Sequence, residues 1–304
     1  MQLRFLPSFP WTIVGLLSAG VLLSLFHASP FPLDDHFFYQ AFVETLAAGK
    51  LDLTIQGFHG SDFLVVPWHL LSRSPISQIE FQMFCAVLVP LCAFLAGKTL
   101  YKSDTGAVLL ACIFAMMPFV LFAGLRGWTG PSYMVLMLLA IASARRFPVV
   151  AGVLLAFAIL TKPFAVALLP LILVLQSSQK KRFQWMFLLC AIGIPILYIW
   201  LQYSQAGQVL VGAHSGYNHI TVWQGPTRIV LNLAHALQIL FSVHNYYFVD
   251  PALTGPGNMM HTTPILVFLG LFALLGKGVS NQPVSIRKAL LLGAVIGIGL
   301  NALL

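Results

Sequence analysis

Nine apolar stretches, separated by short polar segments, constrain the fold of this chain more than any other feature. They cover residues 11–27, 81–100, 105–123, 131–144, 148–160, 163–176, 183–203, 262–276 and 289–304. Only 16 basic and 8 acidic residues occur among 304, and 59% of the residues are hydrophobic. A soluble globule of this composition would lack the polar surface needed to cover itself. The sequence therefore predicts an all-α, polytopic transmembrane helical bundle with about nine membrane segments.

Several of these stretches are shorter than the ~20 residues that a helix needs to cross a ~30 Å hydrocarbon core at right angles. We therefore expect tilted, broken or re-entrant helices. The first stretch is expected to be a retained span, with a cleaved signal peptide ending at Ala28-Ser29-Pro30 as the alternative. We expect residues 1–304 to form a single membrane domain. The last stretch runs to Leu304 without a polar tail, which fits either a minimal module or a fragment of a longer protein.

Basic residues predict the orientation, because short cytoplasmic loops collect Lys and Arg. If residues 148–176 enter and leave the membrane as a helical hairpin, Arg4, Arg145 and the cluster at 180–182 all fall on the cytoplasmic side. The alternative is one helix kinked at Pro163, which would place the cluster at 180–182 outside. The hairpin agrees better with the distribution of charge. An integral protein of a bacterial inner membrane, with its site facing outward, is the expected arrangement.

Two segments, 28–79 and 204–261, are then long enough to build a site on the outer side. With this topology the net charge of +8 reflects orientation, and no basic patch interleaved with aromatic residues suggests nucleic acid as a partner. The four cysteines lie singly inside apolar stretches, where a thiol behaves as a small hydrophobic group. They predict neither a disulfide framework nor a zinc motif.

The run Leu33-Asp34-Asp35-His36-Phe37-Phe38-Tyr39 carries the strongest chemical signal. Asp34 and Asp35 stand where helix N-caps are favoured, ahead of an apolar periodicity typical of an amphipathic surface helix. That periodicity comprises Phe37, Phe38, Ala41, Phe42 and Leu46. Helix capping alone would explain one aspartate. The second, with His36 beside it, leaves a carboxylate that can accept a proton or hold a cation.

Histidines and basic residues supply further candidates on the outer side. His59, His69, His214, His219 and His261 could join Asp34 or Asp35 around a divalent cation, yet none has the helical i, i+4 spacing of a metal motif. No metal ligand is therefore assigned, and a divalent cation stays an open alternative. Lys162 and Arg126 are the candidates to bind an anion, with snorkelling to lipid headgroups as the alternative for Lys162.

Two segments resemble the GT-C superfamily of multispan glycosyltransferases that use polyprenyl-phosphate sugars. The first is the acidic pair with its aromatic helix, followed by Gly49 and by Pro67-Trp68-His69-Leu70-Leu71. The second is the apolar stretch 151–170 around Thr161-Lys162-Pro163, which is similar to a hairpin of the aminoarabinose and protein O-mannosyl transferases. The resemblance spans residues 10–205, whereas 206–304 match nothing in that family and the large soluble C-terminal domain of many members is missing.

The resemblance implies an inverting transfer of a hexosyl or pentosyl group from a polyprenyl-phosphate donor to a lipid, glycan or protein acceptor. In that family the first acid of the outer loop is the catalytic base, which corresponds to Asp34, and Asp35 fits the usual second acid. The expected substrate-binding residues are Arg126, Lys162, His36, Tyr39, His59 and His69.

Two other functions fit the same residues. In a carrier of lipid-linked intermediates, the acidic pair and Lys162 would only bind headgroups. A metal-handling membrane protein would depend on the histidines alone.

Overall fold

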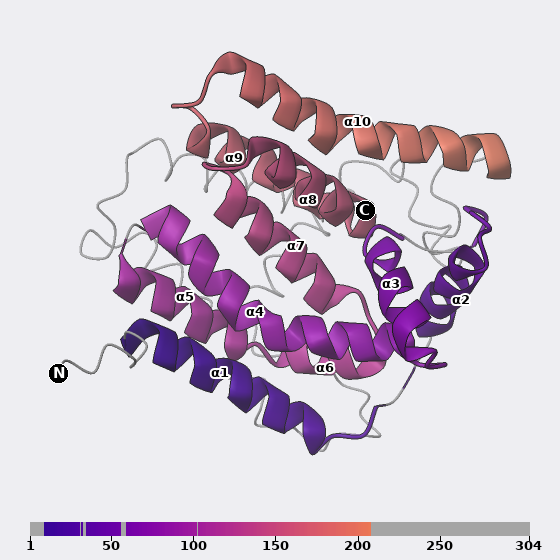
Figure 1. Ribbon diagram of the computed structural model, residues 1–304, viewed down its shortest axis with the longest axis horizontal. Coiled ribbons are helices and arrows are strands. Elements are labelled where there is room, and N and C mark those ends of the chain that lie inside the picture. Colours follow the sequence, from indigo (N-terminus) through magenta and orange to yellow (C-terminus); the bar gives the residue numbers. More distant parts are fainter. Residues whose placement is uncertain (1–8, 31, 33–34, 56–58, 102, 208–304) are drawn as a thin grey trace, which may run out of the picture.

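The computed structural model describes residues 9–30, 32, 35–55, 59–101 and 103–207, and these residues form a helical bundle (Figure 1). Apart from one 3-10 helix, η1 (Pro163–Leu168), the regular elements of this part of the chain are all α-helices. They are α1 (Phe9–Phe26), α2 (Asp35–Ala47), α3 (Asp62–Ser72), α4 (Ser77–Tyr101), α5 (Asp104–Ala115), α6 (Pro118–Arg126), α7 (Gly130–Ser143), α8 (Pro148–Thr161), α9 (Leu169–Leu175) and α10 (Lys181–Ala206). The all-α prediction is therefore confirmed for the described residues.

Among the helices of the described residues, three are long and apolar enough to cross a membrane. They are α1, α4 and α10, with 18, 25 and 26 residues. At ~1.5 Å of rise per residue, even the shortest of them approaches the ~30 Å thickness of a hydrocarbon core. The other apolar helices have fewer than 18 residues. The number of nine membrane segments stays a prediction, and the expected stretches at 262–276 and 289–304 lie outside the described residues.

The apolar stretch at 105–123 forms two helices where the sequence predicted one segment. Pro118 begins α6, and a proline cannot donate the backbone hydrogen bond that would continue α5 past Ala115. Gly97 near the end of α4 touches Ala107 in α5, whereas Gly124 in α6 lies against Ala86 in the first half of α4. Together, α5 and α6 therefore follow α4 along most of its length.

Helix α4 lies at the centre of the bundle and packs against α1, α5, α6 and α7. On the far side of α7 lie α8 and then α10 (Figure 1). Small residues allow close packing here: a Cβ on Gly152 of α8 would lie 2.6 Å from the carbonyl oxygen of Phe187 in α10. Close backbone approach at small residues is the usual way that membrane helices associate.

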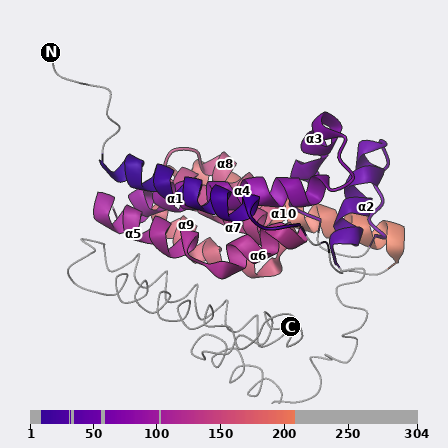
Figure 2. The same cartoon turned by 90° about the horizontal axis from the view of Figure 1, so that it is seen from below.

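The bundle has two different ends. One end carries α2, α3, the start of α4 and the turn between α6 and α7, and we call it the α2–α3 end (Figure 2). The opposite end carries the α7–α8 turn and the start of α10, where the Gln179 side chain donates a 2.5 Å hydrogen bond to the carbonyl oxygen of Arg145. We call it the Arg145 end. The chain reaches the α2–α3 end along α8, turns at Lys162, and returns along η1 and α9.

Candidate functional site

The acidic pair belongs to the start of α2. Asp35 is the first residue of this helix, whereas Asp34 lies outside the described residues. The helix ends at Ala47, and the following Gly49 adopts a positive φ of 80°, a conformation that favours glycine at helix ends. A helix is therefore present where the sequence predicted one, and its position on an outer membrane surface stays a prediction.

The face of α2 that packs against the bundle carries both polar and apolar side chains. His36, Gln40, Phe42 and Val43 are buried, whereas Phe37 is 62% exposed. The apolar periodicity that the sequence suggested is therefore divided, since Phe42 points inward while Phe37 and Phe38 point outward. Its buried polar side chains are the ones that connect α2 to the rest of the α2–α3 end.

Gln40 joins α2 to the first residues of α4. Its side-chain oxygen accepts hydrogen bonds from the Ser77 hydroxyl at 3.3 Å and the Gln78 backbone N–H at 3.1 Å. Its amide nitrogen donates to the Glu44 carboxylate at 2.9 Å. The first N–H groups of a helix have no partner within the helix, so Gln40 satisfies one that would otherwise be buried and unpaired.

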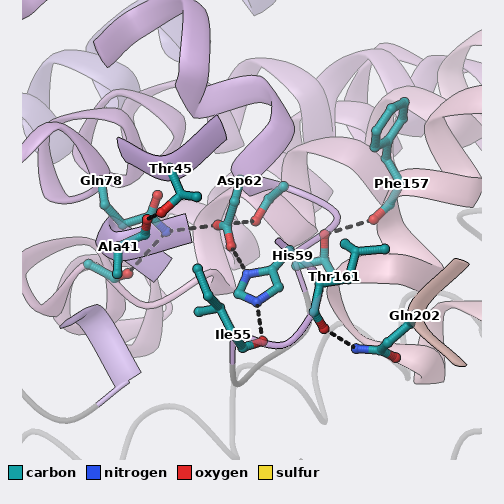
Figure 3. Close-up of polar contacts among 12 residues, drawn as sticks. Ala41, Thr45, Ile55, His59, Asp62, Gln78, Phe157, Thr161 and Gln202 are labelled. Carbon is teal, nitrogen blue, oxygen red and sulfur yellow. Dashed lines mark hydrogen bonds and ion pairs between the residues drawn. The ribbon is translucent and has the colours of Figure 1, made fainter. Parts of the chain in front are cut away.

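A fully buried pair, His59 and Asp62, packs against Phe42 of α2, and Figure 3 shows the polar contacts of the pair. Nδ1 of His59 is 2.7 Å from the Asp62 carboxylate, and Nε2 is 3.0 Å from the Ile55 carbonyl oxygen. The Phe42 ring stacks on the imidazole, with centroids 3.9 Å apart and planes 3° from parallel. Burial raises the pKa of Asp62, and the hydrogen bond from His59 opposes this change.

Gln78 connects this pair with the turn after α6. Its side-chain nitrogen donates to Asp62 at 3.2 Å and to the Gly127 carbonyl oxygen at 3.4 Å. Gly127 ends α6 with a positive φ of 72°, and a Cβ there would lie 2.5 Å from Nδ1 of His36. Both its conformation and its contact therefore require glycine. Burial lowers the pKa of His36, although the nearby Glu44 carboxylate opposes this, so its neutral form is favoured.

The two basic candidates lie at this same end. Arg126 is the last residue of α6, directly before Gly127, and its guanidinium carbon is 5.1 Å from the centre of the Trp128 ring. Lys162 directly follows α8, and its Nζ is 5.9 Å from the centre of the Tyr133 ring. Contacts of this kind hold a cation over an aromatic face.

Gly60 links Lys162 to the buried pair. Its N–H donates a 3.1 Å hydrogen bond to the Leu160 carbonyl oxygen, in the last turn of α8. Because Gly60 directly follows His59, the segment that carries the pair also contacts the end of the helix that carries Lys162.

The remaining sequence candidates occupy different positions at the α2–α3 end. His69 in α3 contacts the Ser77 hydroxyl through Nδ1 at 2.8 Å, and the Tyr39 ring meets the His59 ring edge-on at 6.1 Å. His59 was expected to bind substrate, but its imidazole is in the interior with both nitrogens hydrogen-bonded. Its direct contacts are therefore with the protein.

Sequence reasoning did not identify Gln40, Asp62 or Gln78. Asp62 stands three residues after His59, a spacing that pairs side chains in many local structures and could have drawn attention to it. Glutamines give no comparable signal in a sequence. Within the described part of the chain, no three His, Cys, Asp or Glu side chains come together to hold a metal ion.

Comparisons of the chain with protein-family models, with curated proteins and with solved structures found no match.

Proposed function

We propose that this protein is a membrane glycosyltransferase of the GT-C type that takes sugar from a polyprenyl-phosphate donor. The observation that carries the proposal is the gathering of three parts of the chain at the α2–α3 end. These are the start of α2, with Asp35 and His36, the end of α6 with Arg126, and the α8–η1 turn with Lys162. The contacts of Gly127 with His36 and of Gly60 with Leu160 support their proximity.

Glycosyl transfer needs a base at the acceptor and positive charge at the departing phosphate. In the proposed reaction the acceptor hydroxyl oxygen attacks the anomeric carbon of the sugar, and the bond from that carbon to the phosphate oxygen breaks. Asp34 takes the hydroxyl proton, and the released polyprenyl phosphate keeps the bonding electrons. One displacement of this kind inverts the anomeric configuration.

Arg126 and Lys162 are the groups proposed to bind the phosphate. Basic side chains near the hydrocarbon core are rare and commonly belong to sites that bind ions or substrates, and an anionic phosphate fits such a site. The aromatic rings of Trp128 and Tyr133 support the two cations and would restrict their movement. Each charge-assisted hydrogen bond to the phosphate would become stronger as negative charge develops on the leaving oxygen.

The proposed membrane placement follows from the same bundle. Helices α1 and α10 lie on opposite flanks and expose large apolar side chains, among them Leu23 in α1 and Leu189 in α10 (Figure 1). We place these faces against lipid, with the α2–α3 end on the non-cytoplasmic side and the Arg145 end in the cytoplasm. The polyprenyl-phosphate donor would then enter the site laterally from the bilayer, with its lipid tail passing between the helices.

The decisive experiment is to replace Asp34 by Asn, which keeps the shape of the side chain and can still cap a helix. Purified protein in lipid nanodiscs is offered a panel of polyprenyl-phosphate sugars with membrane-extract acceptors, and released polyprenyl phosphate is quantified by mass spectrometry. A general base typically contributes ~10²- to 10⁴-fold in rate, so Asp34→Asn should reduce release by that factor. Asp35→Asn should have a smaller effect.

Asp104→Asn is the matched control, because this acid lies at the Arg145 end. Release by Asp34→Asn within a few-fold of the parent would remove the catalytic role and would favour a carrier of lipid-linked intermediates, which binds the donor without cleaving it.

A further inference from the structure

The hydrogen bonds of His59 determine how many protons the His59–Asp62 pair holds. The Ile55 carbonyl oxygen can only accept, so Nε2, 3.0 Å away, carries a proton. Nδ1 and the Asp62 oxygen are 2.7 Å apart and need one proton between them, whichever atom holds it. The pair therefore has no net charge, as imidazolium with carboxylate or as imidazole with carboxylic acid. Because both side chains are fully buried, a net charge there would be costly.

This neutral pair connects three helices. The Phe42 ring of α2 stacks on its imidazole, and the Gln78 amide of α4 donates to its carboxyl group. Gly60, directly after His59, lies on the last turn of α8 so closely that a Cβ would be 2.3 Å from the Phe157 carbonyl oxygen. The backbones of the two segments are therefore in direct contact.

Lys162 lies two residues after Leu160, whose carbonyl oxygen accepts the hydrogen bond from the Gly60 N–H. Its backbone N–H donates to the Ala158 carbonyl oxygen at 2.8 Å, so its nitrogen is held by the last turn of α8, although its own backbone is extended. Any movement of the 59–62 segment would therefore be transmitted to the end of α8 and to the position of the Lys162 ammonium group relative to α2.

We propose that His59 and Asp62 are positioning residues for Lys162: by sharing one proton they hold the 59–62 segment between α2 and the end of α8. The inference rests on the proposed function, in which Lys162 binds the donor phosphate. Loss of the shared proton would leave a buried negative charge beside the Phe42 ring and would loosen the contact with α8.

The sign of the pH dependence follows from the proton count. In unfolded chains aspartate titrates near 3.9 and histidine near 6.5. Between these values the folded and unfolded pairs hold equal numbers of protons. Above about pH 6.5 the folded pair keeps a proton that the unfolded chain has released, so the free energy of unfolding falls as the pH rises. Below about pH 3.9 the unfolded chain binds one proton more than the folded pair, so the free energy of unfolding falls as the pH decreases.

The other groups that face the pair respond differently to pH. They are the phenols of Tyr39 from α2 and Tyr198 from α10, while Gln78 from α4 carries no charge. Free phenols titrate near 10, well above the range in which the pair is expected to respond. Lys162 is the basic residue next to the α8 contact.

Hydrogen–deuterium exchange of the full chain in lipid nanodiscs tests the inference, because the N–H groups of Gly60 and Lys162 make the hydrogen bonds at issue. Exchange is measured at about pH 6 and about pH 9, corrected for the intrinsic rate, in parent, Asp62→Asn and Asp62→Ala. Asparagine can donate to Nδ1 of His59 and accept from Gln78, as the protonated acid would, but it does not titrate.

We expect the parent to exchange about 10-fold faster over residues 157–165 at the higher pH, because the pair opens when it loses its proton. Asp62→Asn should remain protected at both pH values, whereas Asp62→Ala should exchange fast at both. The variants should rank in the same order in their affinity for polyprenyl phosphate. Asp62→Ala should raise the Kd about 10-fold, because Lys162 would no longer be held in position for its charge-assisted hydrogen bond to the phosphate. Asp62→Asn should change the Kd less than about 2-fold.

Equal pH responses of the parent and Asp62→Asn would overturn the inference, even if Asp62→Ala does not fold. The inference would also be overturned if Asp62→Ala reduced the protection of residues 104–115, at the Arg145 end, as much as that of residues 157–165. The loss of protection would then extend to both ends of the bundle. The exchange measurement needs no ligand. If Lys162→Met binds polyprenyl phosphate as well as the parent does, the proposed function fails, while the coupling between the pair and the end of α8 is judged separately.

Discussion

The two ends of the bundle differ in where they keep their polar side chains. Thirteen polar or charged residues are buried in the described part of the chain. Twelve of them belong to the α2–α3 end or to the helical turns next to it: His36, Gln40, His59, Ser61, Asp62, Ser77, Gln78, Gln82, Thr129, Ser132, Thr161 and Gln202. Gln176 belongs to the Arg145 end.

The contrast extends to the charged pairs. At the Arg145 end, Lys98 pairs with Asp104, and both side chains are about half exposed to solvent. At the α2–α3 end, His59 pairs with Asp62 in the interior. Buried polar groups are expensive unless each finds a partner, so a structure that concentrates them at one end has a use for them there. The comparison therefore supports the α2–α3 end as the proposed site, whereas the orientation of the two ends in a membrane stays a prediction.

The sharpest test of the comparison is topological and all-or-none. We expect Ser72→Cys, at the end of α3, and Ser178→Cys, before α10, to react with a membrane-impermeant maleimide from opposite sides of the membrane, because both positions are exposed at opposite ends of the bundle. Labelling in intact cells and in inverted vesicles, with a parent lacking its reactive native cysteines, measures this. Reaction of both positions from one side would contradict the hairpin over residues 148–176.

The largest effect on stability is expected from Gly60→Ala. Its Cβ would be 2.3 Å from the Phe157 carbonyl oxygen and 2.5 Å from the Thr161 nitrogen, both backbone atoms that cannot turn away. Overpacking of this kind costs about 1–3 kcal/mol, which should lower the thermal midpoint measured in detergent. Gly20→Ala in α1 is the control, since nothing lies within 4 Å of its Cβ position. Equal midpoints for the two variants would mean that the 59–62 segment is not held against α8.

Loss of the Lys162 charge should weaken ligand binding while leaving the fold intact. Lys162→Met keeps the length of the side chain, and losing a charge-assisted hydrogen bond of about 1–3 kcal/mol corresponds to a Kd for polyprenyl phosphate about 5- to 150-fold higher. Microscale thermophoresis in nanodiscs measures this, with Lys98→Met as the matched variant at the Arg145 end. Unchanged affinity in Lys162→Met would make this lysine an anchor at the membrane interface.

The smallest effect should come from the ion pair at the Arg145 end. Exposed pairs contribute about 0–1 kcal/mol and are screened by salt. Lys98→Met and Asp104→Asn should therefore shift the thermal midpoint little, and less still at high ionic strength. A large, salt-independent loss in either variant would show that this end also contains a structurally essential pair, and the proposed division between the two ends would no longer stand.

The sequence drew attention to some of the residues that lie at the α2–α3 end and missed others for identifiable reasons. The aspartates, histidines and isolated cations drew attention because such groups are rare in an apolar chain, and His36, Arg126 and Lys162 are indeed at one end of the bundle. Asp62 and Gln78 were missed because their importance lies in the hydrogen bonds between them, from positions 16 residues apart. The sequence also did not predict that Phe42 of α2 is buried whereas Phe37 and Phe38 are exposed. Periodicity indicates which residues lie on the same side of a helix, but not which side packs against the rest of the protein.

What the sequence determined by itself was the helical class, because long apolar stretches with few charges leave the backbone no better way to satisfy its hydrogen bonds in lipid. Tertiary structure decided which polar groups meet. The His59–Asp62 pair exists because Phe42, Gln78 and the end of α8 close around it, and burial then fixes how many protons it can hold. Contacts between distant segments, and the low dielectric that they create, cannot be derived from local sequence pattern.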